Sequence, residues 1–204
     1  MQSWSIDEYL DRLAAHHPTP ASSHVAALNL AQGAALLTMV ARVRADRAEG
    51  DVARSVIARA GHVREAALRL AEADAAVVDE VAAAFALARS TEAERARRAA
   101  AIADALLVAA GPPAELVTVG AELVELCERM AEVASGALLG DVAAAADVAA
   151  AALSISRTNV EADIGPRRGT PEAERLVAVI ASVEDLLVRA VTVRDGIRAR
   201  LGGS

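Results

Sequence analysis

The chain has 204 residues and a formal net charge of −7, with 54% hydrophobic and 24% charged residues. This composition excludes intrinsic disorder, and the acidic balance disfavours a general nucleic-acid-binding protein, because phosphate backbones attract basic surfaces. The length suits a single domain over residues 1–204 that is large enough to bury a core. Only 1% of the residues are aromatic. An alanine-, leucine- and valine-rich chain with so few aromatic residues predicts an all-α protein and not a sheet protein.

The mean hydropathy of +0.32 raises the question of membrane insertion. The stretch from Val25 to Val43 is about long enough to span a bilayer, but alanine dominates it and it contains Asn29 and Gln32. A buried helix of a soluble protein is the better interpretation, with no membrane partner. The N-terminal sequence MQSWSIDEYL lacks the basic and apolar regions of a signal peptide, and the single cysteine, Cys127, suits a reducing compartment. We therefore expect a cytoplasmic protein.

The chain opens with a short predicted helix. Ser5 and Glu8 form the Ser-x-x-Glu pattern of a capping box, and the helix that they start is expected to end near residues 16–17. It ends there because Pro18 and Pro20 disfavour helix at the residues before them.

The second helix is the one around which we expect the others to pack. Ser22 and Ser23 offer N-cap hydroxyl groups, and helix-forming residues continue through Val43. Nearly every face of the stretch from Val25 to Val43 is small or apolar, whereas a surface helix has a single apolar stripe. This pattern predicts the buried central helix of a bundle, with its N-terminus opening onto the functional site.

Capping and helix-breaking residues divide the rest of the chain into five more helices. The expected helices cover residues 52–88, 90–110, 114–133, 138–163 and 171–201. Gly50-Asp51, Gly111-Pro112-Pro113, Ser135-Gly136 and the linker at residues 165–169 separate them. About seven helices with short connections predict an antiparallel, up-and-down helical bundle.

The start of the central helix follows a known pattern. Residues 19–28 read Thr-Pro-Ala-Ser-Ser-His-Val-Ala-Ala-Leu, and residues 38–41 read Thr-Met-Val-Ala. They resemble the formiminotransferase-cyclodeaminase C-terminal family, which includes methenyltetrahydrofolate cyclohydrolases and has T-P-G-G-G-S-V-A-A-L followed by A-x-M-V-A. This chain carries Ala-Ser-Ser-His where the family has Gly-Gly-Gly-Ser.

The resemblance extends over most of the chain. Residues 70–87 resemble the family's D-x-x-A-x-x-x-V-x-x-A-x-x-L-P-K segment, and residues 97–113 resemble its R-x-x-A-I-x-x-A segment. The family has S-D-V near residues 140–142 and N-V-R-I-N eighteen residues after the aspartate. Asp141 and Asn159 match these motifs, whereas the arginine and the second asparagine are replaced by Glu161 and Asp163.

The resemblance implies a folate one-carbon enzyme whose substrate is a tetrahydrofolate derivative. The implied reactions are the opening of 5,10-methenyltetrahydrofolate with water and the closure of 5-formiminotetrahydrofolate with loss of ammonia. A chain without a formiminotransferase half favours the cyclohydrolase. The family pairs its subunits around the sites, so a homodimer is also implied.

Asp141 is the first predicted catalytic residue. The resemblance places an aspartate in the folate pocket, and a carboxylate is suited to acid–base work or to stabilising a cationic one-carbon bridge. Asp141 follows a glycine, so an N-cap at the start of a helix is the competing interpretation.

His24 is the second predicted catalytic residue. It lies in the first turn of the central helix, where the helix dipole should keep its imidazole neutral and able to accept a proton. The competing interpretation is a partly exposed histidine of a turn, without a role in catalysis.

The predicted substrate-binding residues lie on two helices. Those of the central helix and its first turn are Ser22, Ser23, Asn29 and Gln32, and those of the helix at residues 138–163 are Asn159 and Arg157. In the alternative interpretation, Asn29 and Gln32 only form hydrogen bonds to neighbouring helices. For Arg157 the alternative is a solvated arginine on the surface. No metal is predicted, because the histidines and Cys127 lack the spacing of a ligand motif.

The alternative function is a family relic that has lost catalysis and acts as a small-molecule-binding or helical interaction module. The replaced glycines support it, because each added Cβ blocks close approach of the backbone and penalises positive φ. Ordinary backbone angles at residues 21–23, with side chains filling the pocket, would favour this alternative.

Overall fold

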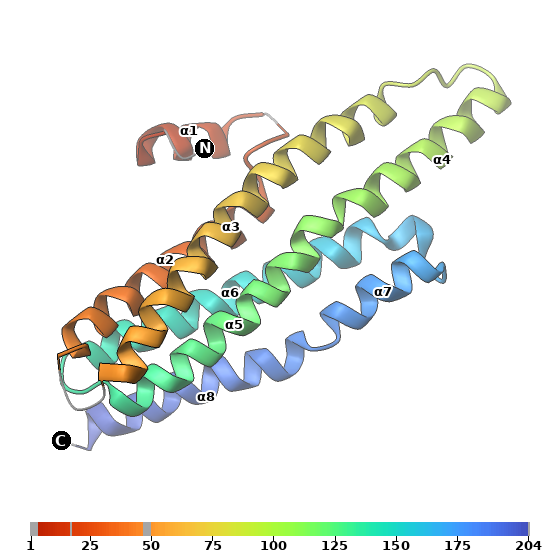
Figure 1. Ribbon diagram of the computed structural model, residues 1–204. Helices are drawn as coiled ribbons and strands as arrows, with labels where there is room; N and C mark the ends of the chain where they lie inside the picture. Colours follow the sequence, from red (N-terminus) through yellow and green to blue (C-terminus); the bar gives the residue numbers. More distant parts are fainter. Residues whose placement is uncertain (1–3, 17, 47–49, 204) are drawn as a thin grey trace.

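The computed structural model describes residues 4–16, 18–46 and 50–203, and these residues contain helices and no strand. The all-α helical bundle expected from the composition is confirmed (Figure 1). The α-helices are α1 (Ile6–Ala14), α2 (Ser22–Arg44), α3 (Gly50–Phe85), α4 (Glu92–Ala109), α5 (Gly111–Val133), α6 (Leu138–Asp163), α7 (Pro171–Ile180) and α8 (Val183–Gly202). A short 3-10 turn, Gly165–Arg167, links α6 to α7.

Two helix boundaries differ from those expected. The last helix, expected to be continuous over residues 171–201, is broken between Ile180 and Val183. The break expected at Gly111-Pro112-Pro113 is only a junction, since Ala110 alone separates α4 from α5. Prolines are tolerated in the first turn of a helix, where an N–H group has no partner within the helix. The first turn of α5 therefore includes Pro112 and Pro113.

The first helix matches its capping box but stands apart from the bundle. The Ser5 hydroxyl accepts from Glu8 N–H, and the Glu8 carboxylate accepts from Ser5 N–H, at 3.2 and 2.7 Å. α1 ends at Ala14, two residues before the expected end, and His17 lies outside the described residues. None of its residues is buried, and Figure 1 shows it set off from α2 and α3.

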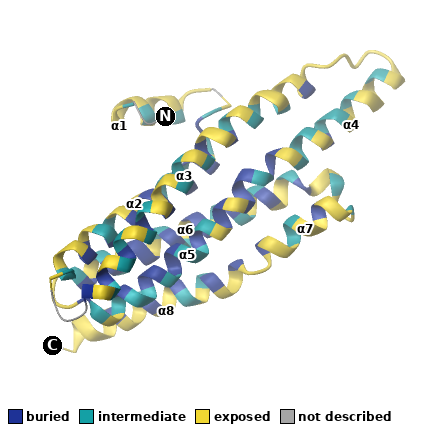
Figure 2. Ribbon diagram, in the orientation of Figure 1, coloured by how far each residue is buried: buried dark blue, intermediate teal, exposed yellow. Residues whose placement is uncertain are grey.

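α2 is the central helix, and it packs against α3, α5 and α6. Its buried face is rich in alanine, and these small side chains let the helices approach closely. Figure 2 shows the buried residues concentrated in the interior of the bundle. A Cβ added at Gly33 would lie 2.9 Å from Leu123 Cδ2 and 3.3 Å from the Ala145 carbonyl oxygen. One stripe of α2 faces solvent, with Met39 and Val43 exposed by 40% and 54%. The helix is therefore apolar all round in sequence but buried on three sides.

α2 and α6 run antiparallel. The Ser22 hydroxyl at the start of α2 donates to Asn159 near the end of α6, and Arg44 at the end of α2 donates to Ser135 just before α6. The N-terminus of α2 and the C-terminus of α6 therefore meet at one end of the bundle. The site described below lies at this end.

Three helical stretches have the length and composition of a membrane span. They are Ser22–Arg44, Glu92–Val133 and Leu138–Asp163, and part of each apolar window is buried inside the bundle. Most of their buried residues form one continuous core with residues of α3 and α8. The expectation of a soluble protein stays a prediction.

Candidate active site

A cluster of polar side chains lies at the N-terminus of α2. Ser22 Oγ donates to Asn159 Oδ1 at 3.0 Å, and Asn159 Nδ2 donates to Ser23 Oγ at 3.0 Å. The sequence suggested that one of the two serines caps the helix, but the N-cap residue is Ala21. Because neither hydroxyl is used as a cap, both bind the α6 amide and join the two helices.

His24 and Asp74 form a buried pair beside these serines. His24 Nδ1 lies 3.5 Å from Asp74 Oδ2 on α3, and the two residues are only 3% and 7% exposed. The same nitrogen accepts from the Ala21 N–H at 3.5 Å. His24 thus occupies the N3 position and makes only the reciprocal half of a capping box, with its ring in the role usually filled by a glutamate, because the Ala21 side chain has no acceptor.

Burial controls the protonation of this pair. It lowers the pKa of His24, and the Asp74 carboxylate offsets part of the effect. Burial raises the pKa of Asp74, while a hydrogen bond from Ser23 and the nearby His24 act in the opposite direction. The neutral imidazole expected from the sequence is therefore favoured, but removal from water is the main reason, where we expected the helix dipole.

Asp163 adds a second acidic group to this end of the bundle. It follows Asn159 by one helical turn at the end of α6 and is half-buried. Burial and the negative charge of Asp74 raise its pKa to about 6. Neither Asp163 nor Asp74 was among the predicted site residues, although both stand inside the segments that resemble the family's motifs. Their proximity depends on how α3 and α6 each pack against α2, which no local pattern shows.

The structure does not bring Asp141 to this cluster. Asp141 lies in the first turn of α6, whereas Asn159 lies near the end of the same helix. Eighteen residues of α-helix span about 27 Å, so the expected pocket shared by Asp141, Asn159 and His24 is not formed within one chain. The competing N-cap interpretation does not hold either, because the N-cap residue of α6 is Ala137.

The other predicted binding residues are dispersed. Arg157 lies 3.1 Å from the Glu184 carboxylate and 3.6 Å from that of Glu161, so its charge is already paired. Gln32 is exposed and lines a groove between α2 and α3. Asn29 is half-buried and makes no hydrogen bond to another described residue. Of the predicted site residues, the structure therefore brings together Ser22, Ser23, His24 and Asn159.

The turn before α2 has ordinary backbone angles. Ala21 has φ of −138°, and positive φ among the described residues occurs only at Gly136 and Gly169. Ser23 and His24 are buried, whereas Ser22 remains exposed. The side chains that replace the glycine-rich turn thus build the cluster itself. Among the described residues, no group of three or more histidine, cysteine, aspartate or glutamate side chains is arranged to hold a metal.

Comparison with known proteins identifies the chain. Residues 5–166 match the model of the family described as formiminotransferase-cyclodeaminase. The methenyltetrahydrofolate cyclohydrolase of Methylorubrum extorquens is 31% identical over 161 residues, which cover 76% of this chain and 77% of that protein. The chain belongs to the formiminotransferase-cyclodeaminase family. The resemblance that the sequence motifs suggested is therefore confirmed.

The fold of this family member also agrees with a solved structure. The crystal structure of formiminotetrahydrofolate cyclodeaminase from Thermotoga maritima superposes with a TM-score of 0.81. The match covers 96% of this chain and 98% of that chain at 22% sequence identity. At this level of identity the likeness concerns the fold.

The pKa of Asp163 predicts how the stability of this family member depends on pH. The folded-state pKa is about 6 against an ordinary value of 3.8, so the unfolded chain releases this proton first as pH rises. Asp163 therefore lowers stability at neutral pH. We expect Asp163→Asn to raise the free energy of unfolding at pH 7.5 by about 1–2 kcal/mol, after allowance for solvent screening.

The gain should shrink as pH falls below about 6 and vanish below the unfolded-state value of 3.8. Urea denaturation of both proteins across this range measures it. Asp51→Asn is the matched control, since the Asp51 side chain is almost fully exposed on α3. An equal gain from the two variants at pH 7.5 would contradict the assignment.

Proposed function

We propose that this protein is a folate one-carbon enzyme, a 5,10-methenyltetrahydrofolate cyclohydrolase or a 5-formiminotetrahydrofolate cyclodeaminase. Family membership and the name of the Methylorubrum extorquens relative support this function. The observation that carries it is the cluster of Ser22, Ser23, His24, Asp74 and Asn159 at the N-terminus of α2. This cluster occupies the position of the motif by which the chain resembles the family.

The proposed reactions need proton transfer close to a cationic carbon. In the cyclohydrolase reaction, water adds to the methenyl carbon, the carbon–N5 bond breaks, and 10-formyltetrahydrofolate and one proton are released. A group that accepts the proton of the attacking water and another that protonates the leaving nitrogen would accelerate both steps. In the cyclodeaminase reaction, a proton must similarly reach the departing ammonia.

The cluster offers groups for this proton transfer. Asp163 is partly accessible, and its pKa of about 6 lies near the usual working range of a general base. We assign proton transfer also to His24, whose neutral imidazole is buried beside the Asp74 carboxyl group. Ser22 and Asn159 form the accessible edge that would contact the substrate. Asp141 lies at the opposite end of α6 from this cluster and is therefore not part of it.

The test is the loss of methenyltetrahydrofolate absorbance with the purified protein. We expect turnover of 5,10-methenyltetrahydrofolate well above the buffer rate. It should also be faster than turnover of 5-formiminotetrahydrofolate, because the Methylorubrum extorquens relative is named a cyclohydrolase. Asp141→Ala, assayed beside the wild type, separates a role for this residue from a role for the α2 cluster. Wild-type rates equal to the buffer rate for both substrates would contradict the enzymatic function.

Two observations favour the second candidate function, an inactive relic that binds a small molecule or another protein. His24 is 97% buried in this conformation, and residues 21–23 have the ordinary backbone angles associated with this alternative. A relic would bind a folate without converting it. Folate binding measured by isothermal titration calorimetry, with no turnover in the absorbance assay, supports this function.

We further propose a homodimer that acts in the cytoplasm, with neither nucleic acid nor membrane as a partner. The exposed apolar stripe of α2, which includes Met39 and Val43, offers a surface for a second copy. The net charge of −7 argues against binding to nucleic acid or to an anionic membrane surface. Sedimentation velocity measures the oligomeric state.

A further inference from the structure

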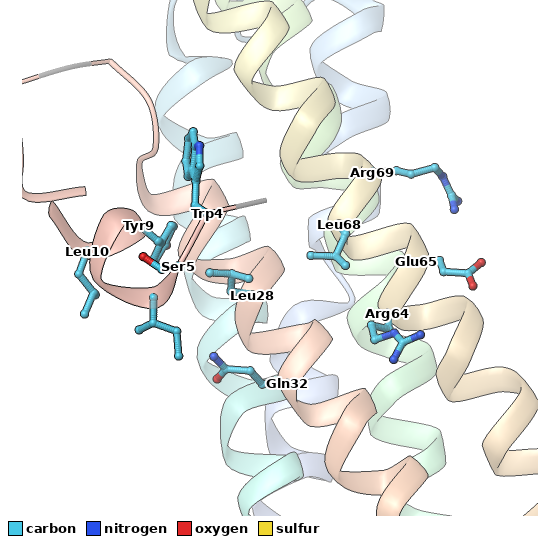
Figure 3. Close-up of a pocket in the computed structure, with 11 residues that line it drawn as sticks. Trp4, Ser5, Tyr9, Leu10, Leu28, Gln32, Arg64, Glu65, Leu68 and Arg69 are labelled. Atoms are coloured by element: carbon cyan, nitrogen blue, oxygen red, sulfur yellow. The ribbon is translucent and has the colours of Figure 1, made fainter. Parts of the chain in front are cut away.

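A cavity of about 830 Å³ lies between α1 and the groove formed by α2 and α3. In Figure 3, residues of α1 lie on one side, residues of α3 on the other, and Leu28 and Gln32 of α2 between them. Sites for small molecules usually enclose roughly 300–1,000 Å³. The cavity is thus large enough for a ligand, and it does not include the polar cluster at the N-terminus of α2.

Aromatic side chains are concentrated in this cavity. Trp4 and Tyr9 both line it, although the whole chain has one tryptophan, one tyrosine and one phenylalanine. The guanidinium carbon of Arg12 lies 4.4 Å from the centre of the Trp4 ring, which helps to hold the ring in place. Leu28 and Leu68 add apolar surface from α2 and α3. Such walls are suited to a flat aromatic ring.

Tyr9 also presents an unsatisfied polar atom. Its hydroxyl group is buried and has no hydrogen-bond partner among the described residues. Burial raises the pKa of Tyr9, so the hydroxyl keeps its proton and remains a donor. A buried donor without an acceptor costs free energy, and a rotation of the Tyr9 side chain toward a ligand carbonyl oxygen in the cavity would recover it.

The rim of the cavity carries a net positive charge. Arg64, Glu65 and Arg69 of α3 line it, and neither arginine forms an ion pair or hydrogen bond with another described residue. In contrast, Arg59 on the same helix is held by Glu122 and Glu125 at 3.1 and 2.7 Å. Two unpaired guanidinium groups beside one carboxylate favour a ligand with a carboxylate of its own.

We propose that this cavity is a binding site for an aromatic ring that carries a carbonyl group and a carboxylate. The choice of ligand rests on the proposed function, because the p-aminobenzoylglutamate part of a folate has this chemistry. Leu28 and Gln32 follow His24 by one and two helical turns. The distance along α2 from His24 to Gln32 is about 12 Å. A folate whose reacting ring lies at the polar cluster would extend its tail into this cavity.

The test uses p-aminobenzoyl-L-glutamate and the full chain. Isothermal titration calorimetry measures the affinity, and the indole N–H resonance of Trp4, the only tryptophan, reports binding inside the cavity. We expect saturable binding that shifts this resonance. Replacing both cations, in Arg64→Gln/Arg69→Gln, should weaken binding at least tenfold, and Tyr9→Phe about threefold to tenfold. The control is Arg97→Gln, an exposed arginine of α4, which should leave the affinity unchanged.

The outcomes separate this proposal from the proposed function. The absence of a saturable shift, or an affinity that none of the cavity variants alters, would overturn the binding site whether or not the protein turns over methenyltetrahydrofolate. Binding with the expected variant effects supports the site even if turnover is absent, since no turnover enters the measurement. A Trp4 resonance that changes with protein concentration and not with the ligand would overturn the proposal in favour of a second copy covering the cavity.

Discussion

Replacing His24 by glutamine is expected to lower kcat/KM for 5,10-methenyltetrahydrofolate by about a hundredfold or more, the usual effect of removing a general acid or base. Glutamine keeps a polar side chain of similar length beside Asp74 but cannot take up a proton near neutral pH. His62→Gln is the matched control, because His62 is exposed on α3 and away from the cluster. We expect its activity to equal that of the wild type.

The partner variant Asp74→Asn distinguishes catalysis from simple structural damage. The Asp74 carboxylate raises the pKa of His24, against the larger effect of burial. Its removal should lower the pKa of His24, and also that of Asp163, so the acidic limb of the pH–rate profile should move to lower pH. A lower rate with an unmoved limb would show that Asp74 has a structural role only. Activity of His24→Gln within twofold of the wild type would remove His24 from the catalytic residues.

Leu30→Ala is expected to lower the free energy of unfolding by about 3–5 kcal/mol, in the range measured for fully buried leucines that leave a cavity. Leu30 is 0% exposed and lies on the side of α2 that contacts α5 and α6. A Cβ added at Gly120 would lie 3.6 Å from Leu30 Cδ2 and 2.7 Å from Leu153 Cδ2, so the leucines fill the space at this glycine.

The surrounding side chains of α5 and α6 offer little possibility of collapse into the space left by Leu30, because they already belong to one closely packed core. Urea denaturation measures the loss. The control is Leu201→Ala, which removes a half-exposed leucine near the C-terminus and should cost less than about 0.5 kcal/mol. Similar losses from the two variants would contradict the central position of α2.

The amino-acid sequence by itself predicted the all-α bundle and most of its helix boundaries. Local chemistry is sufficient for these features, because the capping box predicted at Ser5 satisfies N–H groups within the same turn, and it is present. The sequence also predicted the family and four members of the polar cluster, because the motif at residues 19–28 places Ser22, Ser23 and His24 in one turn and the later motif contains Asn159. The break between α7 and α8 was missed, since no proline or positive-φ glycine marks it.

Only the tertiary structure decided which distant residues meet. Asp74 and Asp163 join the cluster because the middle of α3 and the end of α6 lie beside the start of α2, whereas Asp141, the residue predicted from the motif, lies about 27 Å along α6 from Asn159. The same packing buries His24 and raises the pKa of Asp163. Sequence patterns determine which residues share a helical face, but burial and charge proximity depend on how helices pack.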